Sequence, residues 1–330
     1  MSRKGCIVVS ILVLVVFLIL CGCVFVCVWF SSAFSSLDTQ AAGTVQSEIL
    51  IDGGEDKIVV IDIEGMILDV ESGGGLFTTS VASSQKITRY IDVAISDSKV
   101  KAIILNMDTP GGEVYASDAI YNKVLEAKQN GIKVITLMRS TAASGGYYIA
   151  APSDKIVASK HTITGSIGVR ADFQSLEGLY EKLGIETRTI TNSEGDFKTG
   201  QGLFDDDMHG EEDQIYQEIV DEEFDRFVTI VSEGRGIEKE EVLKFADGRV
   251  FLGSEAKEVG LVDQLGDFDT ALEVASSEAG ITNPTVIGYS EYDLWSTLFG
   301  YVGMLARPEA KVVEALDVQP GIRLFYLYSE

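Results

Sequence analysis

Cysteine and histidine are scarce in this chain, and the scarcity excludes several kinds of chemistry. The 330 residues include only four cysteines, which are Cys6, Cys21, Cys23 and Cys27. The chain beyond residue 27 therefore holds no disulfide, no thiol nucleophile and no cysteine-ligated metal. Only two histidines are present, His161 and His209, so a metal-dependent hydrolase would have to bind its ion through carboxylates alone. We expect no metal and no cofactor.

Basic charge and proline are also in short supply. The chain has 26 lysine and arginine residues against 51 aspartate and glutamate residues, a net charge of −25. Proteins that bind nucleic acid present a basic surface, so we expect no nucleic-acid partner. Five prolines against 33 glycines indicate tight turns rather than a proline-rich linker. The apolar fraction of 46% is sufficient for a large buried core.

One segment near the N-terminus has no charge at all. No charged residue occurs from Gly5 to Leu37, and residues 6–30 are almost wholly apolar. As a helix, such a run extends roughly 37 Å, enough to cross a hydrocarbon core of about 30 Å. Arg3 and Lys4 precede it, which places the N-terminus in the cytoplasm and the later residues across the membrane. A cleaved signal peptide is the competing interpretation, but the run is long for one.

The sequence thus predicts a single-pass protein of the cytoplasmic or plasma membrane, with an extracytoplasmic catalytic domain. Its expected segments are a transmembrane anchor (1–35), a linker (36–55), the catalytic domain (56–283) and a C-terminal segment (284–330). The linker assignment follows from small and polar residues. Within the last segment, residues 291–309 have the pattern of an amphipathic helix that lies on a partner or on the membrane surface.

Strand and helix patterns alternate along the catalytic domain. Apolar, β-branched runs predict strands at 57–67, 101–108, 133–138, 154–159, 164–169 and 185–190. Apolar residues at helical spacing predict helices at 84–97, 114–129, 172–183, 211–233 and 238–246. This alternation predicts an α/β fold with largely parallel strand pairing and right-handed crossovers.

Ser144 lies in the stretch STAASGGYYIA, residues 140–150, where its nearest neighbours have almost no side chain. Small residues at such a place can simply let a helix pack closely on a sheet. They also leave an uncrowded approach to a hydroxyl that attacks a polymer backbone. Both interpretations remain open from this stretch alone.

A serine nucleophile requires a base, and the usual base is histidine. His161 lies between two strand-like runs, and His209 precedes a predicted helix, where capping or surface roles are ordinary. The alternative base is a neutral lysine. Its pKa must fall from about 10.4 to about 7–8, which requires enclosure in an apolar pocket. The residues alone do not show which lysine this is.

Two glycine turns offer backbone N–H groups to a developing oxyanion. The stretch TPGG, residues 109–112, follows a buried strand and precedes a helix, so Gly111 and Gly112 can face a cleft unobstructed by side chains. Gly145, directly after Ser144 at the start of a helix, adds another N–H group. A second small-residue turn about thirty residues after the first strengthens the signal.

Several stretches together resemble the signal peptide peptidase A family, which comprises membrane-anchored Ser–Lys peptidases. These are NMDTPGG, STAASGGYYIAAPSDKIVAS, TGSIGV and DGRVFLGSEAKEVGLVDQLGDFDTAL. The resemblance runs from about Lys57 to Ile281 and corresponds to the half-length, single-copy form. It implies a ClpP/crotonase-like fold of repeated β-β-α units. It also implies assembly into a homo-oligomeric ring, in which the serine and the lysine can come from adjacent subunits.

The same resemblance assigns roles to individual residues. It implies that Ser144 is the nucleophile and that Lys198, in EGDFKTG, is the general base. Ser166, in TGSIGV, matches the hydroxyl that hydrogen-bonds the lysine. Gly111 and Gly112 match the oxyanion-hole turn, to which Gly145 adds a donor.

The sequence is therefore interpreted as a membrane-bound serine endopeptidase that uses Ser144 and Lys198 to cleave peptides, remnant signal peptides among them. Two alternatives stay open. One is a ClpP-like, stomatin-associated membrane serine protease with the same Ser–Lys chemistry. The other is a crotonase-like acyl-CoA enzyme, or a non-catalytic scaffold on that fold. The anchor and the lack of an adenine-binding signature disfavour the acyl-CoA enzyme.

Overall fold

The computed structural model describes residues 45–71, 81–173, 176–186, 192, 211–291 and 324–327. The chain divides into two compact units. One comprises residues 1–46 and 290–306, of which only residues 45, 46, 290 and 291 are described. The other comprises residues 47–289 and 307–330 and contains the elements discussed below, apart from residues 45, 46, 290 and 291.

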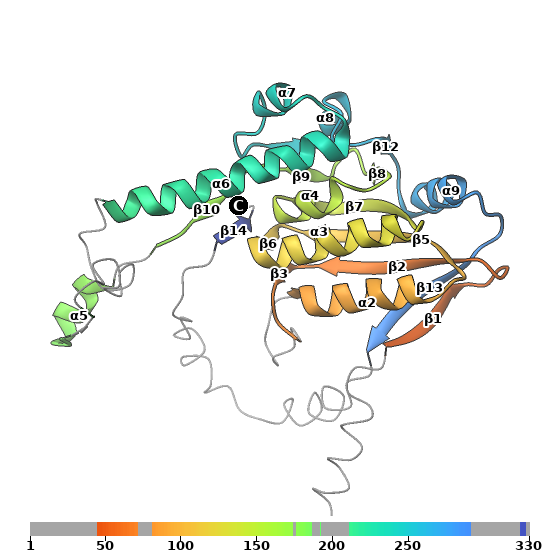
Figure 1. Cartoon of the computed structure of the whole chain (residues 1–330), viewed down its shortest axis with the longest axis horizontal. Coiled ribbons are helices and arrows are strands. Elements are labelled where there is room, and N and C mark those ends of the chain that lie inside the picture. Colours follow the sequence, from red (N-terminus) through yellow and green to blue (C-terminus); the bar gives the residue numbers. More distant parts are fainter. Residues whose placement is uncertain are drawn as a thin grey trace, which may run out of the picture. The chain divides into compact units, whose positions relative to one another are not determined.

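A nine-stranded sheet forms the centre of the larger unit (Figure 1). Its main path runs β1 (Val45–Ile51), β13 (Thr285–Glu291), β2 (Lys57–Glu64), β5 (Val100–Thr109), β7 (Lys133–Ala143), β8 (Lys155–Ala158) and β12 (Gln264–Leu265). From β13 to β12 every neighbouring pair is parallel. The prediction of an α/β fold with largely parallel pairing is confirmed.

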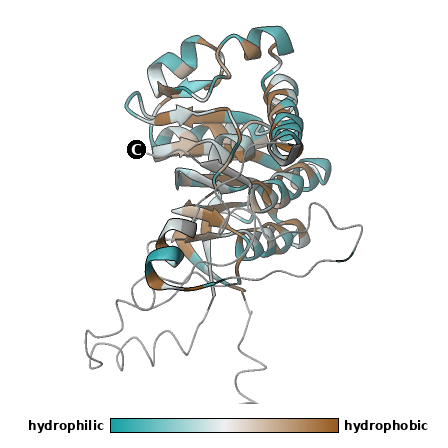
Figure 2. Ribbon diagram, turned by 90° about the vertical axis from the view of Figure 1, so that its left-hand side faces the viewer, coloured by the Kyte–Doolittle hydropathy of each residue, from teal (hydrophilic) through white to brown (hydrophobic). Residues whose placement is uncertain are grey.

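The described helices are α2 (Ser84–Ser96), α3 (Val114–Gln129), α4 (Gly145–Ala150), α5 (Glu177–Leu183), α6 (Glu211–Arg235), α7 (Lys239–Leu243), α8 (Gly253–Glu258) and α9 (Phe268–Ala279). Of these, α2, α3, α4, α8 and α9 pack against strands of the large sheet. Helices α2 and α3 lie side by side along the sheet (Figure 1). The strands are largely apolar and the helices carry hydrophilic residues (Figure 2), as amphipathic packing on a sheet requires.

Both faces of the central strands are buried. On one face Ile58, Ile104 and Leu137 pack with Ala271 and Ala275 of α9 in a single apolar cluster. Within each strand, the residues next to these point to the opposite face, because side chains alternate along a strand. Those residues are buried too. This double burial explains why residues 101–108 form a near-continuous apolar run.

A fork in the sheet sets the position of the loops after β7. Met107 of β5 pairs with Met138 of β7, but Thr109 pairs with Ala142, so β7 carries an irregular stretch between these two pairs. Strand β7 pairs with β8 as far as Met138, and from Thr141 onward it pairs with β9 (Ile163–Gly165). A bulge of this kind bends a strand and redirects the residues that follow.

A smaller, five-stranded sheet lies beyond the fork. Its order is β10 (Arg170–Ala171), β14 (Leu324–Leu327), β6 (Gly111–Glu113), β3 (Met66–Leu68) and β4 (Val81–Ser83). Strand β14 pairs antiparallel with both of its neighbours. The remaining strand, β11 (Val250–Leu252), pairs antiparallel with β9 in the large sheet. One extended strand thus lies between two chain segments that are distant in sequence.

The structure departs from the predicted segments at both ends of the catalytic domain. Residues 45–51, assigned to the linker, form β1, and residues 285–291, assigned to the C-terminal segment, form β13. Strand β1 pairs with β13, and β13 pairs with β2, so their structure depends on a remote partner rather than on local pattern. Helix α5 spans only residues 177–183 of the predicted 172–183, and residues 185–186 are not in a strand.

Among the residues described, no helix is both long enough and apolar enough to cross a bilayer. The apolar run 6–30 lies outside them, as does most of the predicted amphipathic helix at 291–309.

Candidate functional site

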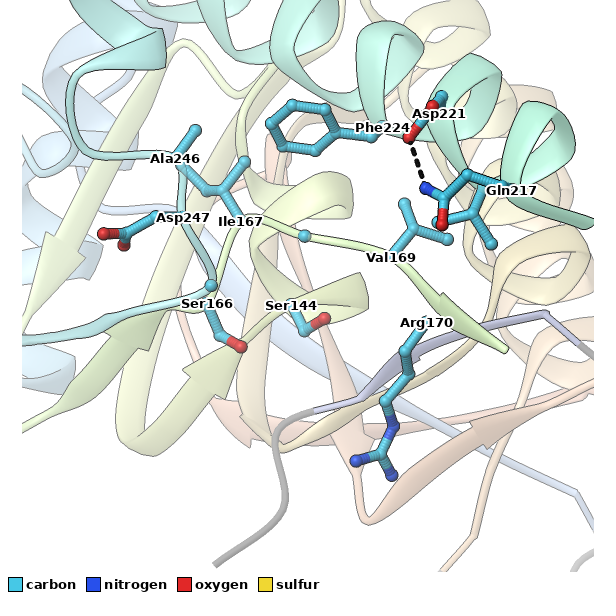
Figure 3. Close-up of a pocket in the computed structure, with 13 residues that line it drawn as sticks. Ser144, Ser166, Ile167, Val169, Arg170, Gln217, Asp221, Phe224, Ala246 and Asp247 are labelled. Atoms are coloured by element: carbon cyan, nitrogen blue, oxygen red, sulfur yellow. Dashed lines mark hydrogen bonds between the residues drawn. The ribbon is translucent and has the colours of Figure 1, made fainter. Parts of the chain in front are cut away.

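A pocket of about 440 Å³ lies where the loops after β7 and β9 face α6 (Figure 3). Its lining comprises Ser144, Ser166, Ile167, Gly168, Val169, Arg170, Gln217, Val220, Asp221, Phe224, Ala246, Asp247 and Gly248. Two of the residues singled out from the sequence, Ser144 and Ser166, therefore line one cavity. Four residues of α6 form its opposite wall.

Ser144 occupies a backbone conformation that serine rarely adopts. Its φ is 54° and its ψ is −117°, in a region that favours glycine. The residue is only 1% exposed, and its N–H donates to the carbonyl of Gly165 at 2.8 Å. It precedes α4, but its side chain makes no capping hydrogen bond. The capping role that normally favours serine at this position is therefore absent, and the strained backbone instead directs the hydroxyl into the pocket.

Two buried tyrosines hold the short helix that follows Ser144. Tyr147 donates its hydroxyl to the carbonyl of Leu261 at 2.9 Å, and complete burial raises the pKa of this phenol well above its ordinary value. Tyr148 donates its backbone N–H to the carbonyl of Ser144 at 2.9 Å. The Tyr147 phenol thus acts as a packing and hydrogen-bonding group.

Ser166, like Ser144, has a positive φ. Its φ is 50°, it is 8% exposed, and its N–H donates to the carbonyl of Arg249 at 2.8 Å. Gly165 before it has a φ of 81°, and a Cβ there would lie 2.7 Å from the ring of Phe251. Because Gly165 also accepts the Ser144 N–H, the two serines are fixed against each other through the backbone.

The turn TPGG lies between β5 and β6 and is fixed by Thr109. This buried side chain donates its hydroxyl to the carbonyl of Gly65 at 2.6 Å and accepts the N–H of Gly111 at 3.1 Å. Gly111 has a φ of 100°. The Gly111 N–H is therefore used within the turn, and what this residue contributes is its conformation.

Gly112 is required by close backbone contact. A Cβ at this position would lie 1.9 Å from the carbonyl oxygen of Ile67. A Cβ at Gly146 would lie 2.7 Å from the side chain of Thr109, so the turn at 109–112 and the start of α4 touch. Gly145 is buried as the first residue of α4. The structure thus brings both glycine turns together, which the sequence could only suggest.

Lys198 lies outside the described residues, so its predicted role stays a prediction. Among the described residues that line the pocket there is no lysine; the charged ones are Arg170, Asp221 and Asp247. The Arg249 guanidinium hydrogen-bonds Asp247 and lowers the pKa of that carboxyl to about 2, so Asp247 is ionised at neutral pH and is unsuited to be a base. His161 is exposed and does not line the pocket, and His209 lies outside the described part.

The wall formed by α6 was not identified from the sequence as part of the site. Val220 and Phe224 face the cavity, and Gln217 donates to Asp221 at 2.8 Å beside them (Figure 3). A helix was predicted here from apolar residues at helical spacing, but periodicity does not distinguish a face that covers a core from one that borders a cavity. Across the described part of the chain, no group of three or more His, Cys, Asp or Glu residues is placed to hold a metal ion.

Comparison with protein families matches residues 126–282 to peptidase family S49. Residues 66–175 also match the NfeD1b N-terminal domain. A putative signal peptide peptidase SppA of Enterococcus faecium is 36% identical over 252 residues, which cover 74% of this chain and 70% of that protein. A putative protease of Methanocaldococcus jannaschii is 36% identical over 72% of this chain and 75% of its own length. Protease 4 of Haemophilus influenzae is 37% identical, and the match covers 34% of its length.

Proposed function

Because this chain belongs to peptidase family S49 and is a serine peptidase, we propose that Ser144 is its nucleophile and Lys198 its general base. The observation that carries this assignment is the backbone of Ser144. The residue is held at a φ of 54° beside the glycine turn, its hydroxyl caps no helix, and it lines the pocket. A serine kept in a strained conformation without a capping hydrogen bond is typical of a nucleophile on a sharp turn.

In the proposed reaction the neutral amine of Lys198 takes the proton of Ser144 as Oγ bonds to the peptide carbonyl carbon. The N–H groups of Gly112 and Gly145 stabilise the oxyanion. The C–N bond then breaks, and the lysine ammonium gives its proton to the leaving amine. In the second half, the lysine takes a proton from water, whose oxygen attacks the ester carbon, and Oγ leaves with that proton. Ser166 would orient the lysine.

We propose that the substrate binds as an extended strand in the smaller sheet. The space between β6 and β10 already accepts one antiparallel strand, β14, which pairs with Gly111–Glu113 on one side and with Arg170–Ala171 on the other. A peptide bound in this way would take the place of β14 and pass the pocket that contains Ser144. Main-chain hydrogen bonds would give affinity, and side-chain pockets would give selectivity.

The finer features of the proposal follow the resemblance and the relatives. The fold would be a ClpP/crotonase-like array of β-β-α units, anchored through residues 6–30 in the cytoplasmic or plasma membrane with the catalytic domain outside the cytoplasm. The chain would assemble with copies of itself into a ring. Remnant signal peptides fit this location, and the Enterococcus faecium relative carries that activity in its name.

The test is covalent labelling of the purified protein by a fluorophosphonate, combined with cleavage of a signal peptide. We expect label on Ser144, and loss of both label and cleavage in Ser144→Ala by at least about 10⁴-fold. Lys198→Met should lose both as well. The matched control is Ser117→Ala, because Ser117 is fully buried and its hydroxyl has no hydrogen-bond partner among the described residues. Cleavage by folded Ser144→Ala would refute the assignment.

The alternatives give different results in the same assay. A stomatin-associated membrane protease would label on Ser144 but would prefer apolar peptides from its partner over signal peptides. An acyl-CoA enzyme or a scaffold would cleave neither.

A further inference from the structure

We propose that Asp118 is a positioning residue of this peptidase, whose carboxylate fixes the helix that carries Ser144 against the helix that forms the pocket wall. The inference rests on the proposed role of Ser144 as nucleophile. Asp118 belongs to α3 and does not line the pocket, so it acts through other residues.

One oxygen of Asp118 binds two helices at once. Oδ1 accepts the hydroxyl of Tyr148, in α4, at 2.8 Å and the Nη2 group of Arg226, in α6, at 2.9 Å. Oδ2 accepts the side-chain amide of Asn122, one turn further along α3, at 2.8 Å. Hydrogen bonds to an ionised acceptor are stronger than neutral ones. The carboxylate is therefore a junction of α3, α4 and α6, which lie next to one another (Figure 1).

The bond to Tyr148 connects Asp118 to the nucleophile through a single intervening residue. Tyr148 is fully buried, and its own N–H donates to the carbonyl of Ser144 at 2.9 Å. Its ring stacks edge-on against Tyr121 of α3 at 5.3 Å and against Phe227 of α6 at 5.1 Å. The phenol end, the ring and the backbone of one residue are thus fixed together. A shift of the phenol would be transmitted to the carbonyl of Ser144.

The bond to Arg226 reaches the pocket wall. Arg226 follows Phe224, which lines the pocket, on the same helix. Further along α6, a Cβ on Gly234 would lie 2.4 Å from the carbonyl oxygen of Ala151, directly after α4. The close approach fixes the far end of α6 against α4, and Asp118 fixes its middle. The separation of the wall from Ser144 therefore depends on both contacts.

The third helix connects the junction to the oxyanion turn. Strand β6, which contains Gly112, ends at Glu113, and α3 begins at Val114 without a loop. Asp118 lies one turn into that helix. The turn at 111–113, the start of α4 and the wall of α6 are thus all connected to one carboxylate, although none of them is adjacent to another in sequence. A residue with only a structural role would stabilise this arrangement without affecting turnover by the folded enzyme.

Variants of the two arms of the junction test the proposal, with fluorophosphonate labelling rate, kcat and KM measured on the full chain. Tyr148→Phe removes the arm to α4 and should slow labelling and lower kcat by about tenfold, with KM within about twofold, because small displacements of a nucleophile are costly. Arg226→Met removes the arm to α6 and should raise KM by about threefold with little change in labelling. Asp118→Asn replaces the ionised acceptor with a neutral, weaker one and should show both effects.

Additivity separates a shared junction from independent contacts. The double variant Asp118→Asn/Tyr148→Phe should label no more than about twofold more slowly than the slower of the two single variants, because both substitutions act on the same bond. Two controls should keep wild-type kcat and KM. Asn122→Ala removes a bond that stays within α3, and Asp97→Asn breaks a part-buried ion pair with Lys57 elsewhere in the sheet.

Two failures are distinguishable. If the wild-type protein does not label on Ser144, the proposed function is wrong. If the wild type labels but Tyr148→Phe and Asp118→Asn label at the wild-type rate, Asp118 has only a structural role and the proposal is overturned. Should Asp118→Asn fail to fold, Tyr148→Phe and Arg226→Met, each of which retains the carboxylate, decide the question through the split between kcat and KM.

Discussion

The two ends of strands β5 and β7 differ in how their connections are built. At the amino ends the turns are ordinary: Val100 donates its N–H to Asp97 at 2.9 Å, Val134 donates to the Asp154 side chain at 2.8 Å, and a glycine, Gly131, takes the positive φ of 83°. At the carboxyl ends Ser144, a serine, has a positive φ beside Gly111. Among the non-glycine residues described, only Ser144, Ser166 and Asn283 have positive φ.

The difference shows where the molecule maintains strain. Two of those three residues line the pocket. At the amino ends, by contrast, the positive φ occurs at a glycine, which adopts it without strain. Strained non-glycine conformations persist only where the surrounding structure enforces them, and they concentrate at functional sites. The carboxyl ends of parallel strands are also where ligands bind in open α/β sheets. The following predictions test this contrast.

The largest effect is expected from placing a side chain on a glycine at each end. Gly112→Ala puts a Cβ 1.9 Å from the Ile67 oxygen, so β3 and β6 must separate, and we expect a loss of more than about 4 kcal/mol or failure to fold. Gly131→Ala meets no atom within 4 Å and should cost only about 1 kcal/mol, for its positive φ. Urea unfolding and peptide cleavage measure both. Equal free energies of unfolding for the two variants would contradict the difference between the two ends of the strands.

A smaller effect is expected from relieving the strain at Ser144. Ser144→Gly and Ser144→Ala both lack the hydroxyl, but only glycine suits a φ of 54° with a ψ of −117°. We expect the glycine variant to be more stable than the alanine variant by about 1 kcal/mol, after the entropy that glycine adds to the unfolded chain. At Ser117, inside α3, the order should reverse by about 1 kcal/mol. The same order at both sites would show that Ser144 is unstrained.

The smallest effect is expected at the amino end, from Asp97. Its hydrogen bond with Lys57 and the backbone N–H of Lys99 lower the pKa of this carboxyl. Its stabilisation is fully present above the unfolded carboxyl pKa of about 3.9 and is lost as pH falls through the lower pKa of the folded state. Asp97→Asn should cost up to about 1 kcal/mol at pH 7. Unfolding curves at several pH values should show this difference narrowing below about pH 4, with cleavage at neutral pH unchanged.

What the sequence predicted follows from local pattern. The helix at 114–129 matches α3 at both ends, and the strand at 101–108 lies within β5. Both could be predicted because a strand buried on both faces gives a continuous apolar run, and a helix buried on one side gives apolar residues at helical spacing. Ser144, Ser166 and the glycine turn were marked by small residues and by family resemblance. The structure adds the strained backbone of the two serines and the close contact at Gly112.

The remainder depends on partners that are far away in the chain. Strand β14 forms where β6 and β10 both have an open edge, and no pattern within residues 324–327 identifies those neighbours. The role of Asp118 likewise depends on Tyr148 and Arg226, 30 and 108 positions away. Charged residues on a helix surface are common, so only the fold shows which of them joins three helices.

The irregular pairing before Ser144 limits how the chain can vary in length. Between Met138 and Ala142 three residues of β7 lie opposite a single residue of β5, Asp108. Thr162 donates its hydroxyl to the Arg139 carbonyl at 2.5 Å, and the Asp108 side chain accepts the Thr141 N–H at 3.1 Å, so these residues are held in place. Side chains alternate between the two faces of a strand. Deleting one of these three residues would therefore reverse the faces to which the following side chains point. Surface loops can lengthen or shorten freely, but an odd change here would turn Ser144 away from its pocket.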